Sequence, residues 1–172
     1  AKPSLLGLGR AYLPEGVVKD GKVVRPDLLG GIISRLWADA RFKSRNVILG
    51  VSNQDVLIRT ALIPRCPPER LNSAIRFQAQ DFLPVSINDV ELDYIVLDDM
   101  AKTQAETIKV LLVAGRRSML GGFLQVVGDA GLKLIDIDVS LLAMARLVRK
   151  QAENQPLAIV HFTKEQAGMA IL

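Results

Sequence analysis

The sequence predicts an α+β fold with the element order β-β-α-β-β-α-β between Asn46 and Val139. Two observations predict it. Short apolar stretches with the period-two alternation typical of strands recur between stretches whose apolar residues follow helical spacing. Pro, Gly and Asp-Gly separate these stretches, as expected at turns and helix ends. We therefore expect helices on one face of a sheet, with parts of a larger structure on both sides.

The first part of the chain is expected to contain a strand, a hairpin and a helix. The strand covers Leu5–Tyr12, and two Val-Val pairs then flank Asp20-Gly21, a dipeptide typical of tight hairpins. Asp27–Ala40 has helical spacing, with Asp27 as its expected N-cap. Gly30 and Gly31 each weaken this helix by about 1 kcal/mol, and we expect them to admit another element closely.

Two strands and a proline-bounded helix follow. Asn46–Ser52 and Asp55–Ile63 are predicted strands, and their short Asn53-Gln54 link predicts a hairpin. The helix begins at Pro67 and Pro68, where proline is tolerated, and stops before Pro84. Its apolar face is expected to lie on a sheet, and its outward side chains are expected to be Arg70, Arg76, Gln80 and Asp81.

The later elements alternate in the same way. Two strands are expected over Val90–Leu97 and Glu106–Ala114, followed by a helix over Arg117–Ala130 that stops at Gly131. A strand over Lys133–Val139 and a helix from a Ser140 cap to about Ala152 come next. The last two expected strands cover Leu157–Phe162 and Ala167–Leu172.

Composition excludes several classes of function. The 172 residues carry a net charge of +4, and the densest basic cluster, Arg41, Lys43 and Arg45, is only three charges long and contains a single aromatic residue, Phe42, so no nucleic-acid partner is expected. One cysteine and one histidine exclude an internal disulfide and a zinc site of the usual kind. The apolar runs are too short to span a bilayer, and the first residues lack the pattern of a signal peptide. These features predict a cytoplasmic protein.

Isolated reactive residues favour structural roles. His161 could be a ligand or base, but a lone histidine at a strand end is more often structural. Cys66 lacks a partner base, which favours an incidental turn residue over a reactive thiol. Asp98, Asp99 and Glu106 could bind a cation, although a solvated acidic turn is the simpler interpretation.

Three segments carry a family resemblance. They are "LPEGVVKDGKVVRPDLL", "LIPRCPPERLNSAIRFQAQDFLPVSINDVELDYIVLD" and "AGLKLIDIDVSLLAMARL". The central segment has an Ile-Pro step, a proline-started helix, a Leu-Pro exit and then Leu92-Asp93-Tyr94. In this order and spacing, the chain resembles the type IV pilus assembly proteins of the PilM family, which is similar to FtsA.

The resemblance implies part of an actin-like ATPase fold with an inserted SHS2-like subdomain. Residues 1–45 would belong to the first core subdomain, 46–139 to the inserted interaction subdomain, 140–155 to the return helix, and 156–172 to the start of the second core half. It also implies a place on the cytoplasmic face of the inner membrane, as an adaptor that binds the N-terminal tail of a PilN-like membrane protein. A homo-oligomer is a further possibility that the resemblance leaves open.

The phosphate loops depart from the pattern of the actin-like ATPases. Nothing before Leu5 supplies the first Asp-x-Gly loop, and His161 and Thr163 stand where the second loop would have its Asp and Gly. Imidazole is a poor Mg²⁺ ligand beside carboxylate, and a Thr side chain crowds the phosphates. The expectation is therefore that ATP and magnesium could bind an intact parent but not this chain. The alternative is an actin-like ATPase of the type II secretion or FtsA-like division class, with its catalytic loops outside these residues.

The partner-binding residues are expected on two elements that would form a cleft. Its expected walls are the helix Leu28–Trp37 and the strand Asp55–Ile63, and the tail is expected to lie there in extended or helical form. The expected contact residues are Leu29, Ile33, Trp37, Arg59, Arg76 and Gln80.

Overall fold

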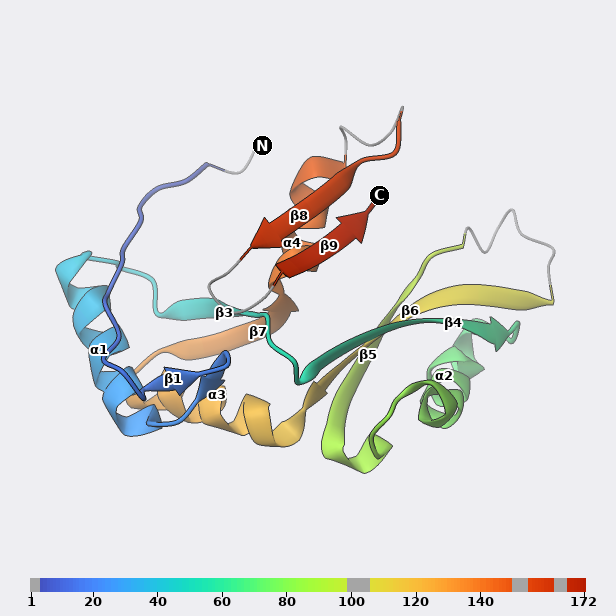
Figure 1. The fold of residues 1–172 in the computed structure, drawn as a ribbon, viewed down its shortest axis with the longest axis horizontal. Coiled ribbons are helices and arrows are strands. Elements are labelled where there is room, and N and C mark those ends of the chain that lie inside the picture. Colours follow the sequence, from blue (N-terminus) through green and yellow to red (C-terminus); the bar gives the residue numbers. More distant parts are fainter. Residues whose placement is uncertain (1–3, 99–105, 150–154, 163–166) are drawn as a thin grey trace. The chain divides into compact units, whose positions relative to one another are not determined.

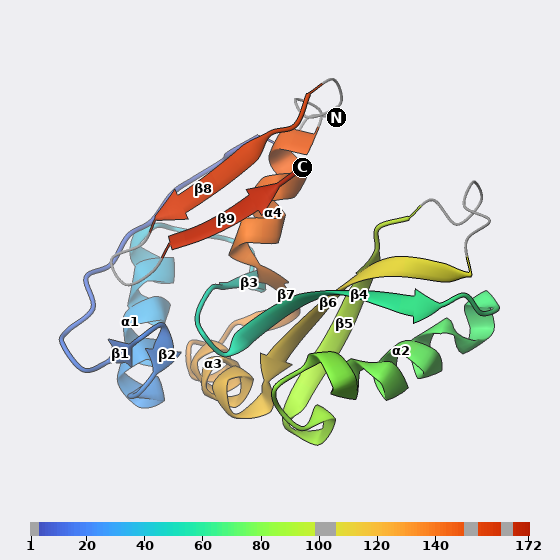
Figure 2. The ribbon, with the colours of Figure 1, turned by 45° about the vertical axis from the view of Figure 1, so that its right-hand side comes forward.

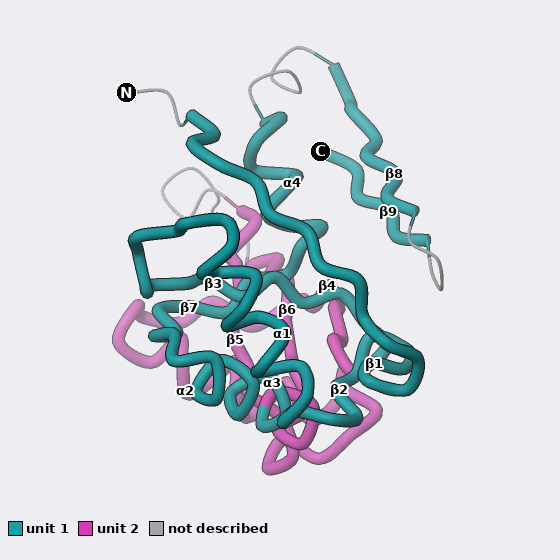
Figure 3. Tube along the Cα trace, turned by 90° about the vertical axis from the view of Figure 1, so that its left-hand side faces the viewer, with its two compact units in different colours: residues 1–54, 121–172 teal, residues 55–120 magenta. Residues whose placement is uncertain are grey.

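The computed structural model describes residues 4–98, 106–149, 155–162 and 167–172. The chain divides into two compact units (Figure 3): one contains residues 1–54 and 121–172, and the other contains residues 55–120. Figure 1 follows the elements along the chain. The predicted order from Asn46 to Val139 is confirmed, since the strands and helices there run β3, β4, α2, β5, β6, α3, β7.

The unit of residues 55–120 is built on an antiparallel sheet with strand order β4-β6-β5 (Figure 2). β4 covers Val56–Pro64, β5 covers Val90–Val96, and β6 covers Thr107–Arg116. α2 (Pro68–Phe82) covers one face, and a short 3₁₀ turn, Ile87–Asp89, leads into β5. The core consists of Ala61, Ile63, Leu71, Ile75, Ala79, Leu83, Val90, Ile108, Val110, Leu112 and Ala114.

The proline-bounded helix α2 forms as predicted. Pro68 opens it, and Leu83, which precedes Pro84, leaves the helical region with φ −101° and ψ 131°. Leu71, Ile75 and Ala79 are buried at four-residue spacing, and the predicted outward residues are exposed. Phe82 is 36% exposed, because it lies in the last turn, where the helix ends.

The edge strand β4 carries its proline on the outer side. Arg116 N donates to Asp55 O, and Arg65 N donates to Glu106 O, so the odd-numbered backbone groups of β4 face β6. Pro64 is therefore among the residues that face away from the ladder, where the missing N–H costs no strand hydrogen bond.

The other unit begins with the predicted hairpin. β1 (Val18–Lys19) pairs with β2 (Lys22–Val23) across Asp20 and Gly21, whose φ angles are 51° and 69°. Two positive φ angles are required by the tight turn that matches strand twist, and the Asp-Gly dipeptide adopts them readily. Asn53 closes over this turn, because its Nδ2 donates to Gly21 O at 2.8 Å.

Helix α1 (Pro26–Asp39) packs against the hairpin and against α3 (Arg117–Asp129). Val17, Leu29 and Val126 form the buried centre of this contact. The prediction of an Asp27 N-cap is wrong: the cap position is Arg25, and Asp27 lies inside the first turn, where its carboxylate pairs with Arg25 at 3.1 Å.

β3 (Asn46–Val51) does not form the predicted hairpin with β4. It pairs in parallel with β7 (Lys133–Val139), with Val51 opposite Val139. The Asn53-Gln54 link is short enough for a hairpin, but it joins strands of different sheets. The length of the local turn therefore predicted the wrong partner for β3, which pairs instead with β7, a strand more than eighty residues away in the sequence.

The last elements are α4 (Ser140–Val148) and the antiparallel hairpin of β8 (Ala158–Phe162) and β9 (Ala167–Ile171). The predicted Ser140 cap is wrong, because the cap position is Val139 and Ser140 is the first helical residue. The predicted strand Leu5–Tyr12 is also wrong: its residues belong to no helix or strand. The division into actin-like subdomains at 45, 139 and 155 stays a prediction.

Candidate partner-binding groove

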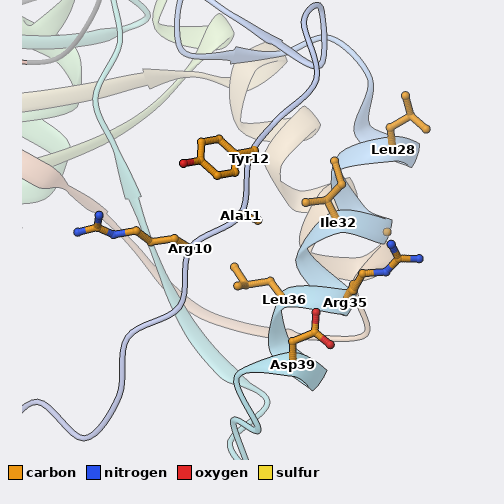
Figure 4. A pocket seen from close by; sticks show the side chains of 9 residues that line it. Arg10, Ala11, Tyr12, Leu28, Ile32, Arg35, Leu36 and Asp39 are labelled. Carbon is orange, nitrogen blue, oxygen red and sulfur yellow. The ribbon is translucent and has the colours of Figure 1, made fainter.

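A groove lies between residues 10–12 and helix α1, entirely within the unit of residues 1–54 and 121–172 (Figure 4). Its volume is about 580 Å³. The lining residues are Arg10, Ala11, Tyr12, Leu28, Gly31, Ile32, Arg35, Leu36 and Asp39. This volume lies within the range of small-molecule pockets.

α1 divides its apolar residues between the core and this groove. Leu28, Ile32 and Leu36 follow one another at four-residue spacing and line the groove. Leu29 and Ile33, each one residue further along, turn instead toward the hairpin and α3. Leu28 is 43% exposed, whereas Leu29 is 6% exposed. The groove floor is thus an apolar stripe that the core of the unit does not use.

Charged side chains lie around this floor. Arg35 and Asp39 come from α1, and Arg10 comes from the facing segment. Among the described residues, none of these three side chains forms an ion pair, so each keeps its charge available for a ligand. An apolar floor with a few charges at its margins suits a peptide better than a highly charged small molecule.

The three α1 residues predicted to bind a partner have internal contacts instead. Leu29 is buried, and Ile33 packs beside it against the same cluster. The Trp37 ring meets Phe42 edge to face at 5.1 Å and 71°, and its Nε1 donates to Ser44 O at 2.7 Å. These contacts give all three residues a structural role, and their partner role stays a prediction.

The other predicted partner residues belong to the unit of residues 55–120. Arg76 and Gln80 are exposed on α2. Arg59 is exposed on β4, where its Nη1 donates to Ile58 O at 2.8 Å. Because Ile58 O belongs to the outer edge of β4, the guanidinium covers part of that edge.

The predicted second phosphate loop is only partly visible. His161 lies half-buried on β8, opposite Gly168 of β9, and Thr163 lies outside the described residues. No group of three or more His, Cys, Asp or Glu side chains suited to a metal occurs among the residues that the structure describes. Imidazole is a poor Mg²⁺ ligand, so His161 does not fit the role of a phosphate-loop aspartate.

The other singled-out residues have ordinary surroundings. Cys66 is a free thiol packed against the core of its unit. Asp98 accepts a hydrogen bond from the backbone N–H of Lys109, and Asp99 lies outside the described residues. Of the three acidic residues considered as an alternative cation site, Asp98 therefore already accepts a hydrogen bond within the protein.

Sequence reasoning missed most of the groove. It named Leu28 to Trp37 as one wall but assigned contacts to Leu29 and Ile33, one residue away from the stripe that lines it. A signal was present in the facing segment, where the small residues Gly7, Gly9 and Ala11 alternate with Leu8, Arg10 and Tyr12. That alternation is typical of an extended segment with one closely packed face.

Comparison with known proteins first gives the fold class. The chain is similar to a chain of a solved structure described as a PilM–PilN type IV pilus biogenesis complex, with 27% identity and a TM-score of 0.85, over 94% of this chain and 49% of that one. It is similar in fold alone to the cytoplasmic domain of EpsL, an inner-membrane component of the type II secretion system of Vibrio cholerae, with 14% identity and a TM-score of 0.54, over 82% and 56% of the two chains. The actin-like fold class is therefore confirmed.

The family follows from the sequence model. The model of the type IV pilus assembly protein PilM family matches residues 8–172, so the chain belongs to that family. It spans about half the length of the PilM–PilN chain that it matches. No curated protein sequence matches it. Within the described residues, no helix has the length and apolar character needed to cross a membrane.

Proposed function

We propose that the chain acts as an adaptor of the type IV pilus inner-membrane platform and binds the N-terminal tail of a PilN-like membrane protein. The observation that carries the proposal is the likeness over 94% of the chain to a protein whose solved structure is a complex with PilN. The groove on α1 supports it, because an unused apolar stripe next to a polypeptide segment is suited to a peptide. The adaptor would then be held at the inner face of the membrane by its partner.

We propose further that this binding needs no nucleotide. In the described residues, the position expected to hold a phosphate-loop aspartate is a half-buried histidine, and no residue that lines the groove belongs to that loop. The alternative of a nucleotide-hydrolysing ATPase of the type II secretion or FtsA-like class gains no support from EpsL, since that likeness extends to the fold alone.

Calorimetric titration of the 172-residue chain with a synthetic PilN-like N-terminal peptide tests the proposal, with and without ATP and Mg²⁺. We expect one-to-one binding that is equal in both conditions, and no binding of a scrambled peptide of the same composition. Absence of binding in both conditions refutes the adaptor role of this chain. Binding that requires ATP, or that appears only with a longer parent that also hydrolyses ATP, supports the ATPase alternative instead.

A further inference from the structure

The sheet in the unit of residues 55–120 ends in a strand on each side. In the order β4-β6-β5, β6 pairs on both sides, and β4 and β5 are the edges within the described residues. Both edge strands are long, with nine residues in β4 and seven in β5. The outward N–H and C=O groups of a long edge strand can pair with a strand of another copy, so such edges promote aggregation.

The hydrogen-bond register identifies the backbone groups on these outer edges. Leu97 N donates to Lys109 O, so the odd-numbered residues of β5 face β6 and the even-numbered ones face away. In β4 the even-numbered residues, Pro64 among them, face away as well. Ile58 therefore lies on the outer edge of β4, and Tyr94 lies on the outer edge of β5, each inside its strand and not at its end.

A charged side chain already occupies a backbone group on each outer edge. Arg59 Nη1 donates to Ile58 O at 2.8 Å. On the other edge, Asp93 Oδ1 accepts a hydrogen bond from Tyr94 N at 2.8 Å. Because both backbone groups face outward, both charges lie where an added strand would bind. That strand would have to break the hydrogen bond and take the charge out of water, which costs free energy.

The sequences of the three strands follow the same division between edge and centre. Arg59 is the only charged residue of β4 and interrupts the stretch VLIRTALIP. β5 carries two carboxylates, Glu91 and Asp93. The central strand β6, which pairs on both sides, has an uninterrupted apolar run over Val110–Ala114. A charge inside an apolar edge strand is a known way to prevent pairing between copies.

We propose that Arg59 and Asp93 close the two edges of this sheet against a second copy of the chain. The guanidinium covers the β4 edge and the carboxylate covers the β5 edge, while Pro64 offers no N–H to an added strand. Closing both edges is important because pairing of β4 in one copy with β5 in the next would repeat and give open-ended chains. All contacts that carry this inference lie within the unit of residues 55–120.

A matched pair of double variants of the 172-residue chain tests the proposal. The edge variant, Arg59→Thr with Asp93→Thr, removes one positive and one negative charge and places a residue that favours strands at both positions. The control, Arg76→Thr with Asp81→Thr, removes the same charges from exposed positions of α2. In size-exclusion chromatography with light scattering, the edge variant should form multimers at concentrations at least about tenfold lower than the control and the wild type.

Single variants separate the two edges. Arg59→Thr and Asp93→Thr each open one edge, so each should at most about double the mass of the wild-type species, whereas the double variant should exceed this. In hydrogen exchange followed by mass spectrometry, rising protein concentration should slow exchange of β4 in Arg59→Thr and of β5 in Asp93→Thr. Both residues are exposed, so circular dichroism should show that each single variant is folded. If the double variant does not fold, the single variants decide.

Three results would overturn the proposal. One is equal association of the edge variants, the control and the wild type at all concentrations. Another is association of the edge variants without slower exchange of β4 or β5, because the copies then meet at another surface. The third concerns Arg59→Lys, which keeps a charge on the β4 edge and should behave as the wild type; association as strong as that of Arg59→Thr would show that the charge does not close this edge. None of these measurements involves the tail peptide, so the proposed function is tested separately.

Discussion

Gly30 and Gly31 provide a test of how α1 packs, because the same substitution has opposite expected effects at adjacent positions. A Cβ on Gly30 would lie 2.6 Å from Asp129 Cβ and 3.4 Å from Val126 O, both on α3. A Cβ on Gly31 would meet nothing within 4 Å. The prediction that these glycines admit another element is therefore confirmed for Gly30 and wrong for Gly31.

The magnitude follows from two opposing contributions. Gly→Ala in a helix interior stabilises by about 1 kcal/mol at either position. At Gly30 the new methyl group also overlaps α3 by about 1 Å relative to an ordinary carbon–carbon contact of 3.5–4.0 Å. Overpacking of this kind costs about 1–3 kcal/mol. Gly31→Ala should thus raise the free energy of unfolding by about 1 kcal/mol, and Gly30→Ala should lower it by up to about 2 kcal/mol.

Urea unfolding followed by Trp37 fluorescence measures this difference. Trp37 is the only tryptophan and lies on α1 itself, so its signal reports the unit that contains both glycines. Because the propensity gain is common to both variants, the difference of about 1–3 kcal/mol between them isolates the contact with α3. Equal stability of Gly30→Ala and Gly31→Ala would contradict the close approach of the two helices.

Three further predictions test the hairpin, the core of the second unit and the start of α1. Asn53→Ala leaves Gly21 O without the amide donor that lies 2.8 Å away, and should lower the stability of its unit by about 1–3 kcal/mol in the Trp37 assay, whereas the exposed Gln54→Ala should have almost no effect. Ile75→Ala empties a fully buried site and should lower the free energy of unfolding by about 2–5 kcal/mol. Phe77→Ala, at a residue 78% exposed on the same helix, should change it by less than about 0.5 kcal/mol. Native-state hydrogen exchange of α2 compares the two variants. The hydrogen bond from Arg25 holds the pKa of the Asp27 carboxyl below its ordinary value of 3.8. Any stability from this exposed pair is therefore present above that pH and is lost as the pH falls through the lowered pKa. Carbon NMR titration should show the low pKa of Asp27, and persistence of that low pKa in Arg25→Gln would disprove the cause.

The elements that the sequence predicted well are those with local signals. Pro68, Pro84 and Gly131 mark helix ends because each residue restricts or permits a specific backbone conformation at its own position. The pairing of β3 failed for the opposite reason. Nothing within Asn46–Gln54 distinguishes an antiparallel neighbour from the distant β7, since both bury the same apolar side chains.

The candidate site could be predicted only to the level of its helix. Leu28, Leu29, Ile32, Ile33 and Leu36 form one wide apolar face in the sequence, and periodicity does not show which half of that face meets the core. The division is set by the hairpin and by α3, whose Val17 and Val126 cover Leu29 and leave Leu28 open. Packing between elements distant in sequence therefore decides which residues remain free to bind.

This division also means that folding and binding can be changed separately on one helix. Leu29 and Gly30 face buried partners, so their substitution should alter stability first. Leu28 and Gly31 line the groove, and neither belongs to the buried cluster of this unit, so their substitution should alter ligand contact with little cost in stability. A loss of tail binding in Leu28→Glu at unchanged stability would therefore identify the groove as a binding surface.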